Sequence, residues 1–261
     1  MNLPIEIIKA VQQKNCVLFA GPGFAREAIE ALGRDIPDDL MLAKAMGWKR
    51  PKRLMGTRKR RDAPDPAIAA EKLLQSEGRS AVLEVIRKVL SLDDLEPTDA
   101  HRIGLQHFPL IISTASDGLW VTASKTDSSH SIRDRGDDIG DIDENQPSVY
   151  HLWGRYSQPE RVTLDAGQKP LPPHVNKQLK NLLRRKVIFF VGYRPDETHF
   201  EHLWQLLSQV YGGELPRCHL AVAQGRIDDY LWQKWVWRGL LMFTADPTEC
   251  FDVLERRLND S

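Results

Sequence analysis

Short apolar runs alternate with segments of helical periodicity along most of this chain. The run at 16–20 (CVLFA) leads directly into Gly21-Pro22-Gly23, and helix-forming residues follow as far as Gly33. A strand, a glycine turn and a helix in this order form the first unit of a nucleotide-binding α/β fold. Similar apolar runs predict further strands at 108–114, 149–154, 160–165, 187–193, 218–223 and 239–245.

Between these strands, apolar positions recur every three or four residues, as they do in amphipathic helices. Helices are predicted over 3–15, 65–77, 78–91, 173–186, 196–213 and 247–258. Strands that alternate with helices predict a parallel sheet covered on both faces. We therefore expect a single Rossmann-like α/β domain over residues 1–261, with a helical insert at about 33–100. A segment without apolar periodicity, at about 124–148, is expected to be a flexible acidic loop.

The overall composition is that of a soluble globular protein. Hydrophobic residues make up 41% and charged residues 28%, and the net charge is zero. The field of the whole molecule therefore gives no reason to expect nucleic acid or a membrane surface as a partner. No apolar run approaches the roughly 20 residues that span a bilayer. The N-terminal residues lack a secretory hydrophobic region, so the predicted location is the cytoplasm.

The neutral total hides a polarised chain, because residues 44–61 are strongly basic and residues 134–144 are strongly acidic. The basic segment is either a solvated face, a docking site for a partner chain or nucleic acid, or a source of phosphate contacts. It contains few aromatic residues and no recognisable nucleic-acid motif. Nucleic acid is therefore expected to bind only through this segment or through a partner.

Only three cysteines are present, Cys16, Cys218 and Cys250, and they form no CxxC pair. This scattered set argues against a disulfide framework and against a four-cysteine zinc ribbon. We expect three reduced, buried thiols and no metal.

Four strand ends carry the candidate chemistry: 21–23, 114–117, 151–154 and 192–196. Ligands of open parallel sheets bind outside the carboxyl ends of the strands, beside a switch in strand order. The first turn could place backbone N–H groups against a phosphate, although Arg26 leaves the GxGxxG pattern incomplete. Each end also has a structural explanation: backbone freedom for the glycines, a core position for His151, and a helix N-cap for Asp196.

Taken in order, these motifs resemble the sirtuin-like NAD-consuming fold. GxG follows the first strand, TxxD the second, HLxG the third and VGYxxD the fourth. The chain resembles most the zinc-free bacterial sirtuin-like NAD hydrolases of antiphage defence. The resemblance covers roughly residues 5–257, and DAHRIGLQHFPLIISTASD is similar to the family's approach to its threonine-threonine-asparagine turn. Each motif is short, so the specificity of the resemblance lies in their order and spacing.

This resemblance implies a role for each motif, with NAD+ as the substrate and no metal. His151 would be the catalytic histidine, and Asp117 the aspartate that closes the catalytic turn. The cofactor-binding set would comprise Gly21, Pro22, Gly23, Phe24, Thr114, Gly154, Gly192, Tyr193 and Asp196.

Two positions depart from the family pattern. Ala25 stands where the family usually has serine, and Ala115 stands where it has its catalytic asparagine. An amide can donate to a ribose hydroxyl and accept from a water at once, whereas alanine can do neither. Losing one well-placed polar group typically costs about two to three orders of magnitude in rate. The alanine is either an introduced exchange for asparagine or a natural loss, and both origins stay open.

Three hypotheses for the function follow. The first is an NAD+ glycohydrolase domain of a bacterial immune effector, inactivated here by Ala115, which depletes NAD+ to nicotinamide and ADP-ribose. The second is a naturally non-catalytic module that binds NAD+ or ADP-ribose and signals by assembly. A deacylase is disfavoured because the zinc cysteines are missing. The resemblance further implies a homo-oligomer or a larger defence complex.

Overall fold

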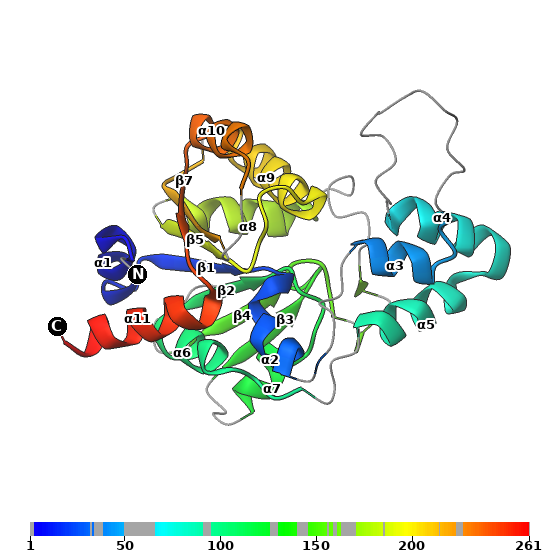
Figure 1. Cartoon of the computed structure of the whole chain (residues 1–261), viewed down its shortest axis with the longest axis horizontal. Helices are drawn as coiled ribbons and strands as arrows, with labels where there is room; N and C mark the ends of the chain where they lie inside the picture. Colours follow the sequence, from blue (N-terminus) through cyan, green and yellow to red (C-terminus); the bar gives the residue numbers. More distant parts are fainter. Residues whose placement is uncertain are drawn as a thin grey trace.

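Parallel strands form the centre of the molecule. The computed structural model describes residues 3–31, 33, 39–49, 66–90, 95–125, 130–139, 146–155, 157–158, 161–162, 171–184, 186–213, 215–222 and 227–260. Within them, a seven-stranded sheet has the order β3-β4-β2-β1-β5-β6-β7, and every pair is parallel (Figure 1). The strands are β1 Cys16–Ala20, β2 Leu110–Ser113, β3 Ser131–Asp134, β4 Ser148–His151, β5 Val187–Val191, β6 Cys218–Val222 and β7 Leu240–Thr244.

Helices cover both faces of this sheet, so the expected Rossmann-like α/β fold is confirmed. One face packs against α8 (Pro173–Leu183), α9 (Thr198–Tyr211) and α10 (Asp229–Trp237). The other packs against α1 (Ile5–Gln12), α6 (Asp99–His107), α7 (Leu119–Ser124) and α11 (Pro247–Asn259). Residues of β1 alternate between the two cores and are all buried. This two-sided burial explains the unbroken apolar run at 16–20.

A helical lobe stands beside the sheet (Figure 1). It contains α3 (Asp39–Ala45), α4 (Pro66–Glu77) and α5 (Arg79–Leu90), whose side chains form a separate small core. Val162, from the segment after β4, packs against this core. The helix α6 packs with α7 and α11 on the sheet.

The structure differs from the sequence predictions in several places. Residues 131–134, predicted as part of a flexible loop, form the edge strand β3. Most of this strand is only half-buried and it contains two charged residues, so it leaves no apolar run in the sequence. Of the strand predicted at 160–165, only Arg161 and Val162 are described and neither is in a strand, while the rest lies outside the described residues. The helices α3, α6, α7 and α10 were not predicted.

Several other predictions can be compared with the structure. All three cysteines are free and buried, as expected. Most of the basic segment 44–61 and much of the acidic segment lie outside the described residues. Within the described part, no helix is both long and apolar enough to cross a membrane.

Two glycine turns pack directly against each other between β1 and β5. The N–H of Gly21 donates to the carbonyl of Val191 at 2.8 Å, and the N–H of Gly23 donates to that of Gly192 at 2.9 Å. A Cβ on Gly192 would lie 2.4 Å from the Phe24 nitrogen, and Gly192 has a φ of +78°. A Cβ on Gly21 would lie 2.4 Å from the Gly192 oxygen. Both turns therefore require glycine because of their mutual packing.

We predict that Gly192→Ala lowers the free energy of unfolding by at least about 3 kcal/mol, because it adds backbone overlap to left-handed strain. Gly212→Ala is the matched control, since Gly212 has a φ of +72° but a Cβ there would meet nothing within 4 Å. That variant should lose only about 1 kcal/mol. Chemical denaturation measures both values, and equal losses would contradict the packing argument.

Candidate functional site

The four strand ends that the sequence singled out lie side by side. In the sheet register, His151 is level with Ser113, Ser113 with Ala20, and Ala20 with Val191. The chain leaves β1 toward β2 on one side and returns from β4 to β5 on the other, so strand order switches between β1 and β5. This switch is where open α/β sheets bind their ligands.

The glycine turn after β1 does not offer the expected phosphate cradle. Because the N–H groups of Gly21 and Gly23 bond to carbonyls of the β5 end, they do not face a ligand. Pro22 opens a short 3-10 helix, η1 (Pro22–Ala25), which leads into α2 (Arg26–Ala31). A ligand phosphate at this turn would need other donors.

Phe24 belongs to the hydrophobic core. Its ring is buried and lies edge-on to His101 at 4.9 Å and to Phe251 at 5.2 Å, between ring centroids. Burial lowers the pKa of His101 to about 3, so this imidazole is neutral at pH 7. In this structure Phe24 therefore contributes packing, and it shows no exposed face for a cofactor.

Thr114, at the end of β2, lies at the centre of a buried hydrogen-bond network. Its hydroxyl lies 2.8 Å from the Tyr193 hydroxyl, 3.0 Å from Nε2 of His199 and 3.4 Å from the Ala20 carbonyl, to which it donates. The edge of Trp153 contacts the His199 ring, with centroids 4.5 Å apart. Burial raises the pKa of Tyr193 and lowers that of His199 to about 4. The network therefore joins the ends of β2, β4 and β5 through side chains that are uncharged at pH 7.

His151 ends β4 and is completely buried, with 0% of its surface exposed. Neither ring nitrogen has a hydrogen-bond partner among the described residues. Burial, reinforced by the Arg155 charge, lowers its pKa to about 4, although Asp134 and the nearby Ala115 carbonyl favour the charged form. The Nε1 of Trp153 is likewise buried without a partner. Such unsatisfied polar atoms are rare in folded proteins and indicate a place where water or a ligand completes the site.

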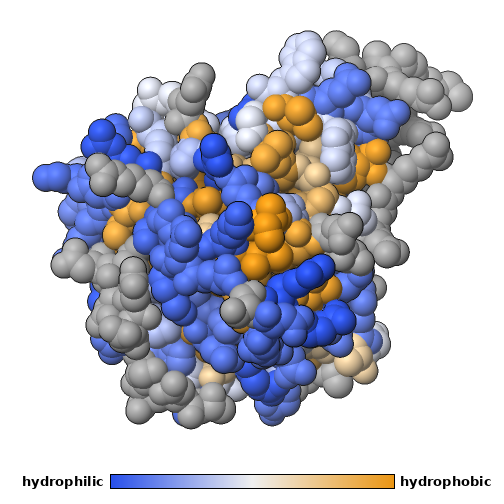
Figure 2. Space-filling view, turned by 90° about the vertical axis from the view of Figure 1, so that its left-hand side faces the viewer, coloured by the Kyte–Doolittle hydropathy of each residue, from blue (hydrophilic) through white to orange (hydrophobic). Residues whose placement is uncertain are grey.

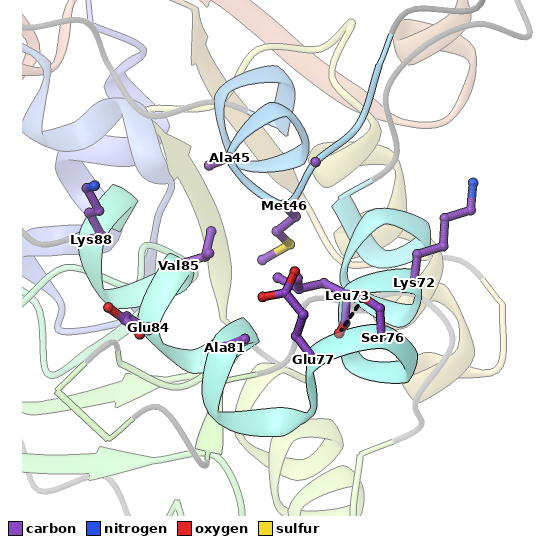
Figure 3. A pocket seen from close by; sticks show the side chains of 11 residues that line it. Ala45, Met46, Lys72, Leu73, Ser76, Glu77, Ala81, Glu84, Val85 and Lys88 are labelled. Carbon is purple, nitrogen blue, oxygen red and sulfur yellow. Dashed lines mark hydrogen bonds between the residues drawn. The ribbon is translucent and has the colours of Figure 1, made fainter.

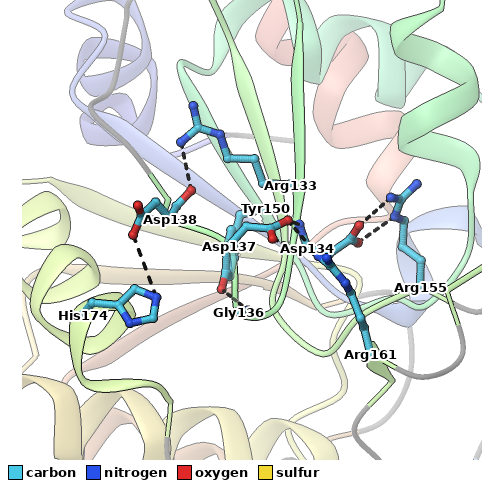
Figure 4. A network of polar contacts seen from close by, with 9 residues as sticks. All are labelled: Arg133, Asp134, Gly136, Asp137, Asp138, Tyr150, Arg155, Arg161 and His174. Atoms are coloured by element: carbon cyan, nitrogen blue, oxygen red, sulfur yellow. Dashed lines mark hydrogen bonds and ion pairs between the residues drawn. The ribbon is translucent and has the colours of Figure 1, made fainter.

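A buried ion pair lies beside His151. Asp134, at the end of β3, is level with His151 in the sheet, and Arg155 Nε donates to its Oδ1 at 2.7 Å. Figure 4 shows Arg155 directed at Asp134 with two contacts, while Arg133 and His174 point toward Asp138. Because the carboxylate is engaged with Arg155, its charge is balanced within the site.

The turn after β2 holds two of the predicted catalytic residues, Ala115 and Asp117. Ala115 is buried and offers only a methyl group, while its carbonyl accepts from the Ser113 hydroxyl at 3.3 Å. Asp117 accepts the Leu119 N–H at 3.0 Å, at the start of α7. Burial raises the pKa of Asp117 to about 6, although this hydrogen bond stabilises the charged form. Asp117 therefore has a clear structural task at the start of α7.

Two further predicted residues are explained by the surrounding chain. Gly154 has a φ of +82°, and a Cβ there would lie 2.4 Å from the Arg161 carbonyl oxygen. Asp196 lies at the surface and pairs with Arg194 at 2.9 Å, while the N-cap of α9 is Glu197. The alternative that Asp196 caps the helix is therefore wrong.

Comparison with known proteins shows what this part of the chain is similar to. Residues 109–238, which include the ends of β2, β4 and β5, match the model of the SIR2-like domain. The match covers just under half of the chain. A crystal structure of a Sir2 homolog–NAD complex shares the fold, with a TM-score of 0.55 and 13% identity over 99% of this chain and 95% of that chain. No curated protein matches the sequence significantly.

A separate pocket of about 520 Å³ lies in the helical lobe, away from the SIR2-like strand ends. Met46, Leu73 and Val85 line its interior, and Lys72, Glu77 and Lys88 lie at its rim (Figure 3). The polar side chains there form no convergent set around one point. Among the described residues, no three histidine, cysteine or carboxylate side chains are grouped so that they could hold a metal ion.

Sequence reasoning missed several polar residues of this SIR2-like site. Asp134 and Arg155 went unnoticed because β3 was assigned to a loop, which left His151 without its charged neighbours. His199 lies three residues after Asp196, on the first turn of α9. The available signal for His199 in the sequence was a histidine on the first turn of the helix that follows the strand ending at Gly192.

Acid should destabilise the protein, because His101 and His151 are buried in the neutral form. Their pKa values lie near 3 and 4, against about 6.5 in an unfolded chain, so the unfolded state binds more protons below pH 6.5. Between pH 7 and pH 5, each histidine should remove about 2 kcal/mol of stability, while the raised pKa of Asp117 restores about 1 kcal/mol. Denaturant unfolding at both pH values checks this, and equal stability would contradict it.

Proposed function

We propose that this chain binds NAD+ and is an NAD+ glycohydrolase. We further propose that its rate of hydrolysis is low because of Ala115. The observation that carries the proposal is the convergence of four candidate segments at the switch point of a sheet whose residues 109–238 are SIR2-like. SIR2-like proteins are NAD-dependent enzymes, so NAD use is the general expectation for this site. The buried, unpartnered nitrogens of His151 and Trp153 support a polar ligand at the same edge.

The proposed reaction replaces the bond between the ribose and nicotinamide with a bond to water. The water oxygen bonds to the ribose carbon, neutral nicotinamide leaves with the bonding electrons, and the water releases one proton. The transition state carries positive charge on the ribose, so the protein needs to orient the ribose and the water and to accept the proton.

His151 is the proposed proton acceptor. It is neutral at pH 7 and has two ring nitrogens without partners, so it can accept a proton. Burial, together with the nearby Arg155 charge, lowers the pKa of His151 and makes it a weak base. An anionic diphosphate beside Arg155 would offset that charge. Asp117 is proposed to contact the substrate through its carboxylate oxygen that does not bond to Leu119.

Ala115 leaves the turn without a group that orients the ribose or the water. Of the two adjacent residues with a hydroxyl, Thr114 is buried and already surrounded by Tyr193, His199 and Ala20, and Ser116 is half-buried. We therefore infer that substrate binding is retained while turnover is slow.

A second candidate function is a non-catalytic module that binds NAD+ or ADP-ribose and signals by assembly. Two observations favour it: Ala115 has no polar side-chain atom, and His151 is fully buried with a pKa near 4. For either function, the proposed setting is an immune effector in a bacterial cell, as a homo-oligomer or in a larger defence complex.

We predict that Ala115→Asn increases NAD+ hydrolysis at least about 100-fold, because it adds one oriented donor and acceptor. Ala115→Leu is the control of similar volume without polar atoms, and it should stay as slow as the parent chain. The measurement is NAD+ consumption with nicotinamide detection, alongside calorimetric titration of each protein with NAD+.

The outcomes separate the candidates. Binding with restored turnover in Ala115→Asn supports the hydrolase, and adding His151→Gln to that variant should then lower the rate again. Binding without turnover in Ala115→Asn supports the non-catalytic module. Absence of NAD+ and ADP-ribose binding to the parent chain would overturn both.

A further inference from the structure

The two edges of the sheet differ in chemical character. The edge strand β3 carries Arg133 and Asp134, and charged residues on an edge strand discourage pairing with another chain. The opposite edge strand, β7, has the sequence LLMFT and contains neither a charge nor a proline. Among the described residues, no strand lies on its outer side. Only one edge of this sheet is therefore protected against further pairing.

Apolar side chains are exposed around this unprotected strand. Leu241, within β7, is 50% exposed, and Trp237, just before the turn at Gly239, is 89% exposed. Val236 is also exposed beside it. Figure 2 views the molecule from the side that carries β7 in Figure 1, and hydrophobic side chains reach the surface there among hydrophilic ones. Exposed tryptophan beside aliphatic residues is typical of protein interfaces.

The backbone of β7 fixes which residues could pair outward. The N–H of Ala245 donates inward to the Val222 carbonyl of β6 at 2.8 Å. Backbone groups of successive strand residues point to opposite sides, so those of Phe243 and Leu241 also point toward β6. The N–H and C=O groups of Leu240, Met242 and Thr244 consequently point outward.

We propose that β7 pairs antiparallel with β7 of a second copy of this chain, with the two-fold axis at Met242. This arrangement sets Met242 opposite its own copy and Leu240 opposite Thr244, so every outward group meets a partner. A two-fold axis requires one patch to complement itself, and an edge strand does so through its backbone. Trp237 and Leu241 then flank the shared strands.

The charges at the ends of β7 fit this orientation. Arg238 precedes the strand and Asp246 follows it. Antiparallel pairing brings the start of one β7 beside the end of the other, so Arg238 of each copy approaches Asp246 of its partner. Arg238 is held in place by Glu201 and lies over the Trp235 ring, 4.9 Å from its centroid. A parallel arrangement would instead bring the two arginines together.

This interface is independent of the proposed NAD+ function, because β7 lies at the sheet edge beyond β5 and β6. One five-residue strand from each copy, with its flanking side chains, makes a small interface of the class below about 1,200 Å². We therefore expect a monomer–dimer equilibrium that depends on concentration.

Sedimentation velocity of the chain over a concentration series, without NAD+, tests the proposal. The parent chain should dimerise, and Leu241→Lys should weaken the dimer at least about tenfold because two like charges enter the interface. Ile68→Lys is the matched control, since Ile68 is 53% exposed in the helical lobe, and it should dimerise like the parent. A parent chain that stays monomeric at millimolar concentration, or equal dimerisation of both lysine variants, would overturn the proposal.

A charge exchange tests the orientation. Arg238→Asp and Asp246→Arg should each weaken the dimer, and the double variant should recover much of its strength. Hydrogen–deuterium exchange gives a readout independent of substitution, because the N–H groups of Met242 and Thr244 should become protected only in the dimer. Protection without concentration dependence, or no recovery in the double variant, would contradict antiparallel pairing about Met242.

Discussion

The close approach of two glycine turns at the switch point constrains the whole site. Gly21 and Gly23 on one side and Gly192 on the other leave no room for a Cβ, and their backbones are joined by hydrogen bonds. This contact fixes where β1 and β5 end relative to each other. Tyr193, which follows Gly192, is thereby brought to Thr114 at the end of β2. The polar network at the sheet edge depends on backbone packing before any ligand is considered.

This close packing changes the interpretation of the glycine turn after β1. In the sequence, a glycine turn after a strand indicates phosphate binding, because free N–H groups attract anions. Here the N–H groups of Gly21 and Gly23 are used within the protein, and the glycines serve the approach of two strands. The meeting of these strand ends at one edge of the sheet was therefore predictable from these residues, although the phosphate-binding role assigned to the glycines was not.

The fold was predictable where burial leaves a pattern and unpredictable where it does not. The strands β1 and β5 are buried on both faces, so their sequences are continuous apolar runs. The edge strand β3 is half-buried and polar, and α10 is rich in aromatic residues on several sides, so neither has a clear period. Within the site, Thr114 and His151 could be found from short motifs. Asp134 and Arg155 could not, because only tertiary contacts join them to the others.

Binding and chemical turnover rest on different parts of this site. The glycine packing and the Thr114 network are formed within the protein itself and shape the sheet edge at which we propose that NAD+ binds. In the proposed reaction, turnover depends instead on position 115, where alanine lacks polar side-chain atoms, and on His151, whose basicity is reduced by burial and by Arg155. Loss of polar or basic character at these two positions leaves the fold and the polar edge of the sheet intact. If the proposed function holds, such a domain can keep its ligand while losing its reaction, because the packing that shapes the site does not involve the groups proposed to perform the chemistry.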